Sequence, residues 1–389
     1  MRAESSYPVE LRKVFEKMSD VLIIGAGING LLLSRELADA GAEVRLLDAG
    51  EVGREASWAG GGIVSPLYPW RYSEPVTALV TWAQKFYPNL VEDLEAETGI
   101  DAQYQRDGLL MLDAADQDQA LAWAARHGQE MSVLNTAGCY QQEENLRSGF
   151  DEGLWMPGVG HVRNPRLCRA LKKSLALNFR VRLSENLPVT EIQSQSGRVT
   201  AVLAGEGGNQ QTFHPDTVVL CAGAWSRGLL PEFEADCEIQ VEPVKGQMLL
   251  YKFDGPPVKS ILLHNGRYLI PRRDGHLLVG STLEYSGFDK SLTEEARLSL
   301  SDSAAEILPV LAEMEPVAQW SGLRPGSKDG IPYIGQVPPW ENLFINAGQF
   351  RNGLVLAPAS ARLLADLLLA REPLVDPRPY QPLTRNTAA

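Results

Sequence analysis

Three glycines and one acid near the start of this 389-residue sequence have the types and spacing that indicate chemistry. Gly25, Gly27 and Gly30 form a G-x-G-x-x-G pattern, and Asp48 follows 18 positions after the last glycine. In such a pattern the glycines allow a tight turn and a close approach of the backbone to a pyrophosphate, and the acid accepts hydrogen bonds from a ribose. The pattern predicts a bound dinucleotide. The alternative is a glycine-rich turn in an ordinary α/β protein.

The elements around these residues are the ones that a dinucleotide site needs. Residues 21–24 are all apolar, which indicates a short buried strand, and a helix is predicted over 29–40. The N-terminus of such a helix directs N–H groups and the positive end of its dipole at phosphates. A second strand over 42–48 ends in the acid. Residues 216–226 hold another buried strand, typical of the return strand below the cofactor, or simply a further parallel strand.

Ordering three consecutive glycines, 60–62, costs more backbone conformational entropy than ordering other residues, so their presence needs a reason. They either let the chain approach a flat ligand or form a mobile loop. Ser57, just before them, is predicted to cap a helix or to contact a phosphate.

Further helices are predicted from apolar spacing, at 76–100, 116–128, 165–177, 293–311 and 354–370. Short strands lie close together in the block 241–283, which favours an antiparallel sheet. This block separates segments of the nucleotide-binding part, so we expect a discontinuous domain with a second domain inserted. The predicted division is an N-terminal extension 1–18, a dinucleotide-binding domain 19–75, 155–235 and 320–389, and an inserted second domain 76–154 and 236–319.

Composition restricts the class of protein. A net charge of -13 argues against nucleic acid or an anionic membrane surface as partner. No apolar run reaches the ~20 residues of a membrane span, and residues 1–17 lack the apolar core of a signal peptide. The 4 cysteines form no C-x-x-C pair, which suggests a reducing, cytoplasmic location, and the 5 histidines show no metal-ligand spacing.

Seven stretches between about residues 19 and 375 together resemble one family: V-L-I-I-G-A-G-I-N-G, S-W-A-G-G-G-I-V-S-P, L-C-A-G-A-W-S, P-V-K-G-Q-M, G-R-Y-L-I-P-R-R-D-G-H-L-L-V-G-S-T, G-L-R-P-G-S and G-Q-F-R-N-G-L-V-L-A-P. The chain resembles the FAD-dependent amine and amino-acid oxidases of the D-amino-acid-oxidase type, among the glutathione-reductase-like flavoproteins. It is most similar to members that oxidise glycine and supply the imine for the thiazole of thiamine. The resemblance implies an α/β fold (α+β overall), with a Rossmann FAD-binding domain and an inserted antiparallel-sheet substrate domain.

The resemblance also implies a set of cofactor contacts. FAD is expected to be non-covalent, because no cysteine lies in a motif associated with covalent flavin. Residues 349–355 would bring backbone N–H groups and a helix N-terminus to the flavin, with Gln349 where relatives often carry His. The residues implied to bind FAD are Gly25, Ala26, Gly27, Ile28, Gly30, Asp48, Ala49, Ala56, Ser57, Gly61, Gly62, Ile63, Val189, Ala222, Gly223, Gln349, Phe350, Arg351, Asn352, Gly353, Leu354 and Val355.

Substrate contacts are implied for Arg324, Tyr268 and Arg351, with Leu283 and Ile63 as apolar walls. Arginine presents the planar, bidentate cation that an amino acid's carboxylate prefers. The alternatives are a surface salt bridge for Arg324, a core aromatic for Tyr268 and a brace of the cofactor loop for Arg351. Relatives can carry a bulkier residue at position 266, so Gly266 is expected to admit substrates beyond glycine.

The implied reaction is hydride transfer from the substrate Cα of a neutral amine to the flavin, with no catalytic base and no metal. Glycine, sarcosine or D-alanine would react with O2 to give glyoxylate or a 2-oxo acid, ammonia and H2O2. The alternatives are a D-amino-acid or sarcosine oxidase or dehydrogenase, and a flavin-binding subunit of a larger complex without activity. The expected assembly is a homo-oligomer, often tetrameric in this family.

Overall fold

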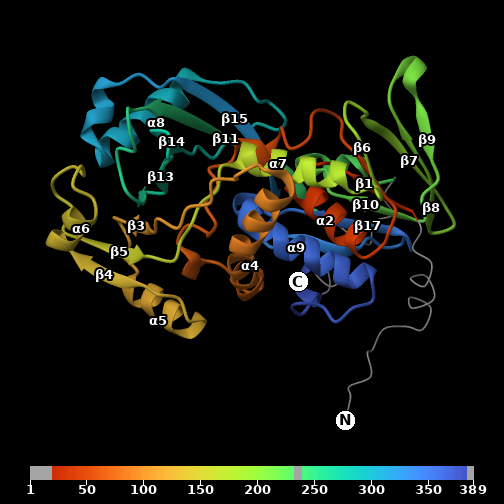
Figure 1. Ribbon diagram of the computed structural model, residues 1–389, viewed down its shortest axis with the longest axis horizontal. Coiled ribbons are helices and arrows are strands. Elements are labelled where there is room, and N and C mark those ends of the chain that lie inside the picture. The colour runs from red at the N-terminus through yellow and green to blue at the C-terminus, as the bar shows by residue number, and fades with distance from the viewer. Residues whose placement is uncertain (1–19, 232–238, 383–389) are drawn as a thin grey trace, which may run out of the picture.

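The computed structural model describes residues 20–231 and 239–382, so the predicted N-terminal extension 1–18 lies outside the described residues. Figure 1 shows two halves side by side. One half contains a six-stranded sheet with its covering helices, and the other contains an eight-stranded sheet. This is the mixed α/β architecture that the sequence predicts.

The six-stranded sheet carries the glycine pattern. Its order is β16 (Tyr333–Gln336), β17 (Leu343–Ala347), β10 (Thr217–Leu220), β1 (Val21–Ile24), β2 (Val44–Leu47) and β6 (Val181–Ser184). All neighbours are parallel except β16 and β17. The parallel pairing of β10 with β1 confirms the predicted return strand. Strand β6 is separate from the strands that follow it in sequence, because it pairs with β2 at the sheet edge.

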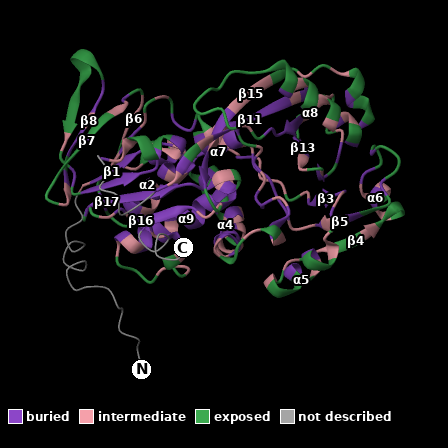
Figure 2. Ribbon diagram, turned by 180° about the vertical axis from the view of Figure 1, so that it is seen from behind, coloured by how far each residue is buried: buried purple, intermediate pink, exposed green. Residues whose placement is uncertain are grey.

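Side chains along β1 point alternately to the two faces of the six-stranded sheet, and both faces are covered. Val21 and Ile23 pack against helices, whereas Leu22 and Ile24 point to the opposite face. The helical layer consists of α2 (Ile28–Asp39), α4 (Glu74–Thr98), α7 (Asn164–Leu177) and α9 (Gly353–Leu368). A small sheet of β7 (Val189–Gln195), β8 (Arg198–Ala204) and β9 (Gln211–Phe213) covers the other face. The buried layer runs through this half in Figure 2.

The eight-stranded sheet is built from the middle of the chain. Its order is β15 (Ala318–Ser327), β11 (Val241–Lys252), β14 (His276–Gly280), β13 (Arg267–Pro271), β12 (Ile261–His264), β3 (Leu109–Met111), β5 (Glu152–Met156) and β4 (Ser132–Asn135). Its pairs are antiparallel except β12 with β3. The predicted antiparallel sheet is therefore present and extends to residues before 241.

Side chains alternate along the strands of this sheet as well, and this determines which of them face the nucleotide-binding half. Leu269 packs with α8 (Glu294–Ile307), whereas Tyr268 and Ile270 lie on the opposite face with α5 (Gln117–His127). Helix α8 begins at the predicted cap, where Thr293 accepts a hydrogen bond from the Ala296 N–H. It ends earlier than predicted, because Pro309 disfavours helical backbone at the residue before it; a 3-10 turn follows. The short α6 (Thr136–Gln142) was not expected.

Two elements lie on the other side of the predicted domain boundaries. Helix α4, assigned by sequence to the substrate domain, packs in the core of the nucleotide-binding half, because Leu79 and Tyr87 join its helical layer. Strand β15, assigned to the FAD-binding domain, pairs along ten residues with β11 of the eight-stranded sheet. A periodic apolar face shows that a helix is buried but not against which partner, so sequence alone could not place α4.

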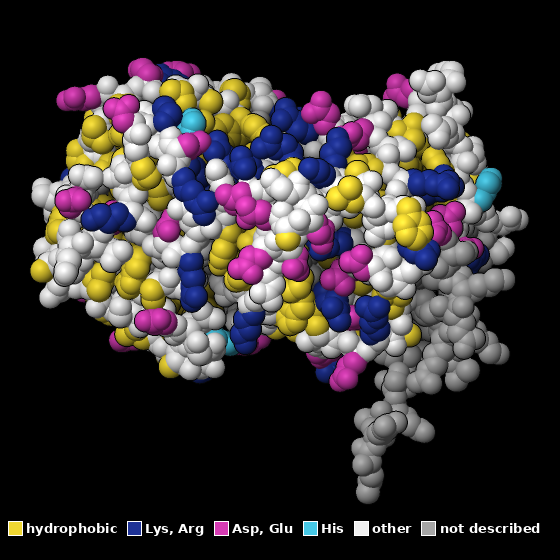
Figure 3. All heavy atoms as spheres, viewed as in Figure 1, with side chains coloured by type: hydrophobic (Ala, Val, Ile, Leu, Met, Phe, Trp, Pro, Cys, Tyr) yellow, Lys and Arg dark blue, Asp and Glu magenta, His cyan; other side chains and the backbone are white. Residues whose placement is uncertain are grey.

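Acidic and basic side chains are interspersed over the face seen in Figure 3. Within 20–231 and 239–382, none of the helices combines the length and apolar character needed to cross a membrane. The same residues contain no group of three or more His, Cys, Asp or Glu side chains arranged to hold a metal.

Candidate functional site

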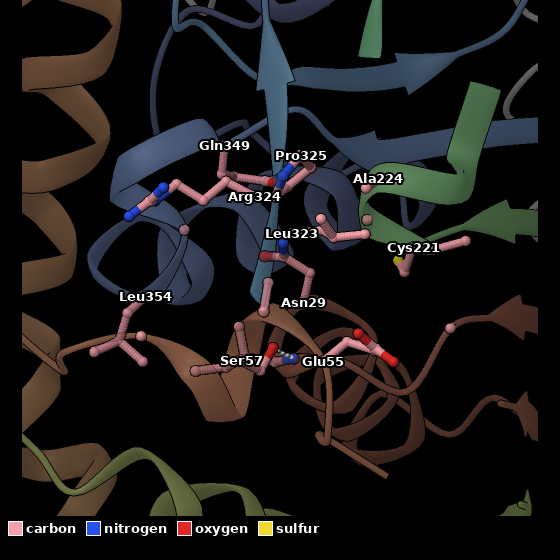
Figure 4. A pocket seen from close by; sticks show the side chains of 18 of the residues that line it. Asn29, Glu55, Ser57, Cys221, Ala224, Leu323, Arg324, Pro325, Gln349 and Leu354 are labelled. Atoms are coloured by element: carbon pink, nitrogen blue, oxygen red, sulfur yellow. Dashed lines mark hydrogen bonds between the residues drawn. The ribbon is translucent and has the colours of Figure 1, made fainter. Parts of the chain in front are cut away.

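A cavity of about 500 Å³ lies where the two halves meet. Its lining comes from the start of α2, the loop after β2, residues 55–63, the ends of β10 and β15, Tyr268 of β13, and residues 349–355. In Figure 4, Leu323 and Arg324 of β15 lie opposite Glu55 and Ser57, with Asn29 between them. One end of the cavity is therefore glycine-rich and the other carries a guanidinium.

The glycines at the first end are required by close packing. Gly25 has φ +104°, and a Cβ there would lie 2.5 Å from the carbonyl oxygen of Cys221. A Cβ on Gly30 would overlap the carbonyl of Gly25. Gly30 does not line the cavity; it lets α2 pack against the turn. The turn therefore keeps backbone, rather than side chains, at the cavity wall.

Asp48 links the end of β2 to this turn. Its carboxylate accepts hydrogen bonds from the Ala26 N–H at 2.7 Å and the Gly50 N–H at 2.9 Å while also lining the cavity. Burial raises the pKa of Asp48, and the two N–H groups oppose that rise. Ala26 itself is buried behind the wall, so its contribution is this backbone hydrogen bond.

Ser57 belongs to the short helix α3 (Ala56–Ala59), and its hydroxyl accepts a hydrogen bond from the Ile28 N–H at 2.9 Å. It therefore occupies the N-terminus of α2 rather than capping its own helix. A Cβ on Gly27 would lie 3.2 Å from this hydroxyl, so the absence of a side chain at 27 permits the contact.

The glycine triplet packs tightly against both halves. A Cβ on Gly62 would overlap the Val162 carbonyl, and one on Gly61 would lie 2.7 Å from Ile270. Arg272 secures this loop: its guanidinium donates to the carbonyls of Gly61 at 2.7 Å and Val162 at 3.0 Å. Close backbone packing, as opposed to a mobile loop, therefore explains the three glycines.

Arg272 is itself held by a buried chain of polar groups. One nitrogen of its guanidinium lies 2.7 Å from Nδ1 of His161, whose Nε2 lies 3.2 Å from Asp107. Burial lowers the pKa of Arg272 to about 9 and also lowers the pKa of His161. A neutral His161 that accepts at Nδ1 and donates from Nε2 satisfies both neighbours. Little in the sequence indicates these contacts, because Arg272 directly follows the end of β13 and is succeeded by the charged residues Arg273 and Asp274.

Arg324 dominates the second end of the cavity. Its guanidinium donates to the carbonyls of Lys245 and Thr282, each at 3.2 Å, and to the Ser281 hydroxyl at 2.6 Å. Burial lowers the pKa of Arg324, and neighbouring Tyr268 favours the charged form. The described residues provide no carboxylate within salt-bridge distance of Arg324, so its charge is available to an anion in the cavity.

A glycine in the neighbouring strand makes room for this guanidinium. In the pairing of β11 with β15, Val244 is opposite Arg324 and Gly246 is opposite Gly322. A Cβ on Gly246 would overlap the guanidinium of Arg324. Gly246 stands in the stretch P-V-K-G-Q-M, but nothing in the sequence indicates why a glycine is needed there; only the strand register reveals it.

Tyr268 and Arg351 lie near Arg324. Tyr268 is buried in β13 and lines the cavity, and its hydroxyl lies 3.3 Å from the sulfur of Met248. Arg351 lies in the 3-10 turn Phe350–Asn352 before α9 and is exposed at the cavity's edge. Like Arg324, it has no acidic partner among the described residues.

Leu283, predicted as an apolar wall, lies elsewhere. Strand β14 ends at Gly280, and the chain then leaves the sheet, so Leu283 is 47% exposed and is not part of the cavity lining. The other predicted wall, Ile63, does line the cavity. Every further residue predicted to contact cofactor or substrate lines the cavity, apart from Ala26 and Gly30 behind the turn.

The structure adds lining residues that the sequence did not indicate. Several are next to predicted site residues in the sequence, so proximity in sequence was an available clue, whereas Asn164 and Tyr72 come from distant segments. The added residues include Asn29, Glu51, Arg54, Glu55, Tyr72, Asn164, Leu187, Cys221, Trp225, Ser281, Leu323 and Pro325.

The lining suits a dinucleotide with a polar ring system. The glycine turn leaves backbone at the wall, and the 16-residue α9 begins at Gly353 without a side-chain cap, so two helix N-termini border the cavity. Three buried side-chain oxygens of lining residues, on Asn29, Asn164 and Gln349, have no hydrogen-bond partner in the described part of the chain. Buried polar atoms without partners indicate groups supplied by a ligand.

Comparisons with known proteins agree with this geometry. The chain is 52% identical to the glycine oxidase of Pseudomonas aeruginosa over 365 residues, which covers 94% of this chain and 99% of that protein. It is 33% identical to the bifunctional protein ThiO/ThiG of Synechocystis sp., with 90% of this chain and 52% of that protein covered. The crystal structure of glycine oxidase from Geobacillus kaustophilus superimposes with a TM-score of 0.86 at 30% identity, covering 93% of this chain and 98% of that one. Residues 20–367 match the DAO family, described as FAD dependent oxidoreductase, and the chain belongs to this family.

Proposed function

We propose that this chain catalyses the FAD-dependent oxidative deamination of glycine, and of small amines such as sarcosine and D-alanine, by O2. The products are glyoxylate or the corresponding 2-oxo acid, the released amine or ammonia, and H2O2. The observation that carries the proposal is the guanidinium of Arg324, which faces the cavity without an acidic partner in the described residues. The similarity to proteins named glycine oxidase supports the same substrate.

In this proposal Arg324 binds the substrate carboxylate through paired charge-assisted hydrogen bonds. Tyr268 adds a hydroxyl beside it, and Arg351 closes the cavity from the side of residues 349–353. Ile63 excludes water from the apolar side of the substrate. Positioning of the amine, rather than proton abstraction from carbon by a side chain, is then the main contribution of the protein, and no catalytic base is assigned.

The cofactor would be held non-covalently along the rest of the cavity. The turn at Gly25–Gly27 and the start of α2 would bind the pyrophosphate, with Asp48 and Val189 toward the adenosine and residues 349–353 toward the flavin. Bound FAD supplies a two-electron acceptor that takes a hydride from the substrate carbon and passes the electrons to O2. The described cysteine on the cavity wall, Cys221, has its thiol pKa raised by burial, which disfavours the reactive thiolate.

One experiment tests the core of the proposal. Glycine added to the purified yellow protein under anaerobic conditions is expected to bleach the flavin, and admission of O2 is expected to restore the colour with release of H2O2. Protein that stays oxidised with glycine, sarcosine and D-alanine would instead support a flavin-binding subunit without activity. Bleaching followed by slow reoxidation in O2 would support a dehydrogenase, and relative rates on the three substrates would identify a sarcosine or D-amino-acid oxidase.

The cellular setting completes the proposal. We place the chain in the cytoplasm as a homo-oligomer, in keeping with its acidic composition and with the burial of Cys139, Cys168 and Cys221 in the described part of the chain. Supply of the imine for the thiazole of thiamine follows from similarity to the bifunctional protein ThiO/ThiG. Growth of a deletion strain without thiamine, with and without the intact gene, tests this last point.

A further inference from the structure

Two of the three groups that hold the guanidinium of Arg324 are backbone carbonyls, those of Lys245 and Thr282. The same two residues direct their side chains to a single carboxylate, that of Glu284. The ammonium of Lys245 lies 3.0 Å from this carboxylate, and the hydroxyl of Thr282 donates a hydrogen bond to it. The position of Arg324 and the position of Glu284 therefore depend on the same two residues.

Glu284 is fixed through its backbone as well as its side chain. Its N–H and its carbonyl each form a hydrogen bond of 2.9 Å with the backbone of Lys245, and the side-chain amide of Gln247 donates to its carboxylate at 3.0 Å. Burial acts to raise the pKa of Glu284, but the hydrogen bonds from Thr282, Lys245 and Gln247 outweigh it and hold this pKa below its ordinary value. The side chain is therefore a carboxylate at neutral pH.

Lys245 is a buried cation that needs this carboxylate. Its side chain is only 2% exposed, and a charge buried without a partner is costly. Its other polar contacts are the Ser291 carbonyl at 3.2 Å and the exposed carboxylate of Asp289 at 3.9 Å. Glu284 is thus the principal counterion. Neither Lys245 nor Glu284 lines the cavity, so neither is placed to touch a substrate.

The charge of Glu284 reaches Arg324 although the two side chains form no salt bridge in the described part of the chain. Burial lowers the pKa of Arg324, whereas the negative charge of Glu284 acts in the opposite direction. An uncompensated carboxylate at this place would compete with a substrate carboxylate for the guanidinium. Lys245 balances that carboxylate, so the pair is neutral and the positive charge of Arg324 is not offset.

We propose that Lys245 is a positioning residue for substrate binding: it holds Glu284 as its counterion and thereby leaves the charge of Arg324 to the carboxylate of the substrate. This inference deepens the proposed function and rests on it, because it concerns the same carboxylate site. A pair that merely braces the fold would behave differently. For a brace, loss of both partners is at least as harmful as loss of one, whereas for a charge-balancing pair the loss of Lys245 alone is worse than the loss of both.

The test measures binding without turnover. Acetate has the carboxylate of glycine but no amine to be oxidised, and its binding to the full-length, FAD-loaded protein is followed as a change in flavin absorbance. The KM and kcat for glycine, from H2O2 production, provide a second measurement. A residue that acts only on the carboxylate should change Kd and KM together and leave kcat within about twofold.

A double-mutant cycle separates charge balance from structural support. Lys245→Met is expected to raise the Kd of acetate and the KM of glycine about tenfold. Glu284→Gln, and the double variant Lys245→Met/Glu284→Gln, should stay within about threefold of wild type, because no unbalanced carboxylate remains. A double variant that binds as weakly as Lys245→Met, or wild-type constants in Lys245→Met, would overturn the inference.

Further variants control for folding and for the loss of a lysine as such. Lys245→Arg keeps the charge and should bind acetate more tightly than Lys245→Met. Lys259→Met is the matched control, because this lysine pairs with Glu144 at 3.4 Å on the surface and should leave both constants unchanged. If Lys245→Met yields no folded flavoprotein, the double variant should still be recovered with wild-type flavin content. Failure of both to fold would show that the pair braces the sheet, and the inference would be wrong.

Arg324→Ala distinguishes failure of this inference from failure of the proposed function. Acetate binding that is lost in Arg324→Ala but unaltered in Lys245→Met would remove the inference alone. Equal binding of acetate by wild type and Arg324→Ala would place carboxylates elsewhere, and the role proposed for Arg324 would then be wrong as well. A wild-type protein whose flavin glycine does not bleach would overturn the proposed function itself.

Discussion

The two ends of the cavity are made from different parts of the polypeptide. At the nucleotide end the wall is largely backbone, brought close by Gly25, Gly27 and Gly62, and much of it comes from one continuous stretch of sequence, residues 24–62. At the substrate end the wall is made of side chains on three distant segments: Tyr268 in β13, Arg324 in β15 and Arg351 before α9. A backbone site depends on local conformation, and a side-chain site depends on how strands align. The consequences of mutation should differ accordingly.

The largest effect is expected from a side chain added at the backbone end. In Gly30→Ala the new methyl group would overlap the Gly25 carbonyl, so the turn and the start of α2 must separate. We expect purified Gly30→Ala to be nearly colourless, measured as visible flavin absorbance per chain. Gly228→Ala is the matched control, because a Cβ there meets no atom within 4 Å. Equal flavin content in the two variants would show that the packing at Gly30 is not limiting.

Arg324→Ala should affect the substrate end and spare the cofactor. Loss of a paired, charge-assisted contact worth ~3 kcal/mol raises the KM for glycine about a hundredfold. Flavin content should equal that of the wild type, and Arg324→Lys should restore part of the affinity. Steady-state H2O2 production over a range of glycine concentrations measures the effect. A wild-type KM in Arg324→Ala would remove the carboxylate role of this residue.

Gly246→Ala tests whether strand register positions the arginine. The added methyl group would displace the guanidinium of Arg324, and we expect KM for glycine to rise about tenfold, equivalent to ~1.4 kcal/mol. Gly255→Ala, at a position with no atom within 4 Å of the new Cβ, provides the control. If both variants keep the wild-type KM, the space opposite Arg324 is not needed for binding.

His161, which contacts Arg272, is expected to make the free energy of unfolding depend on pH. Its pKa is lowered by burial in the folded state, whereas an unfolded histidine titrates near 6.5. Below about pH 6.5 the unfolded state binds a proton that the folded state does not, so the free energy of unfolding falls as pH falls, by at most ~1.4 kcal/mol per unit. Urea unfolding at about pH 7.5 and about pH 5.5 should therefore show a larger loss for wild type than for His161→Gln. A loss of the same size in both proteins would place the pH dependence elsewhere.

The smallest effect on KM is expected at Leu283, which was predicted to line the substrate site but lies outside the cavity. Leu283→Ala should change KM for glycine less than about twofold, as expected for an exposed position. Ile63→Ala, in the cavity lining, should raise KM severalfold. Effects in the reverse order would mean that the chain after β14 folds over the substrate in the working enzyme.

The same contrast explains what could be predicted. The strand–turn–helix around Gly25 and the acid at 48 are local patterns, and each has one structural solution. The antiparallel sheet followed from closely spaced strands. The placement of α4 and β15 could not be predicted in the same way. An apolar face indicates that an element is buried, but it does not indicate which element it packs against.

By itself the sequence determined the glycine turn at residues 25–30, the alternation that turns Tyr268 and Ile270 to one face, and the residues able to bind a carboxylate. The tertiary structure alone decided which of them meet. The register of β11 with β15 opens space at Gly246 for Arg324, and the end of β14 at Gly280 turns Leu283 away. It also brings Arg351 to the edge of the cavity, near Arg324. Backbone conformation is set by neighbours in sequence, whereas contact between distant side chains is set by packing.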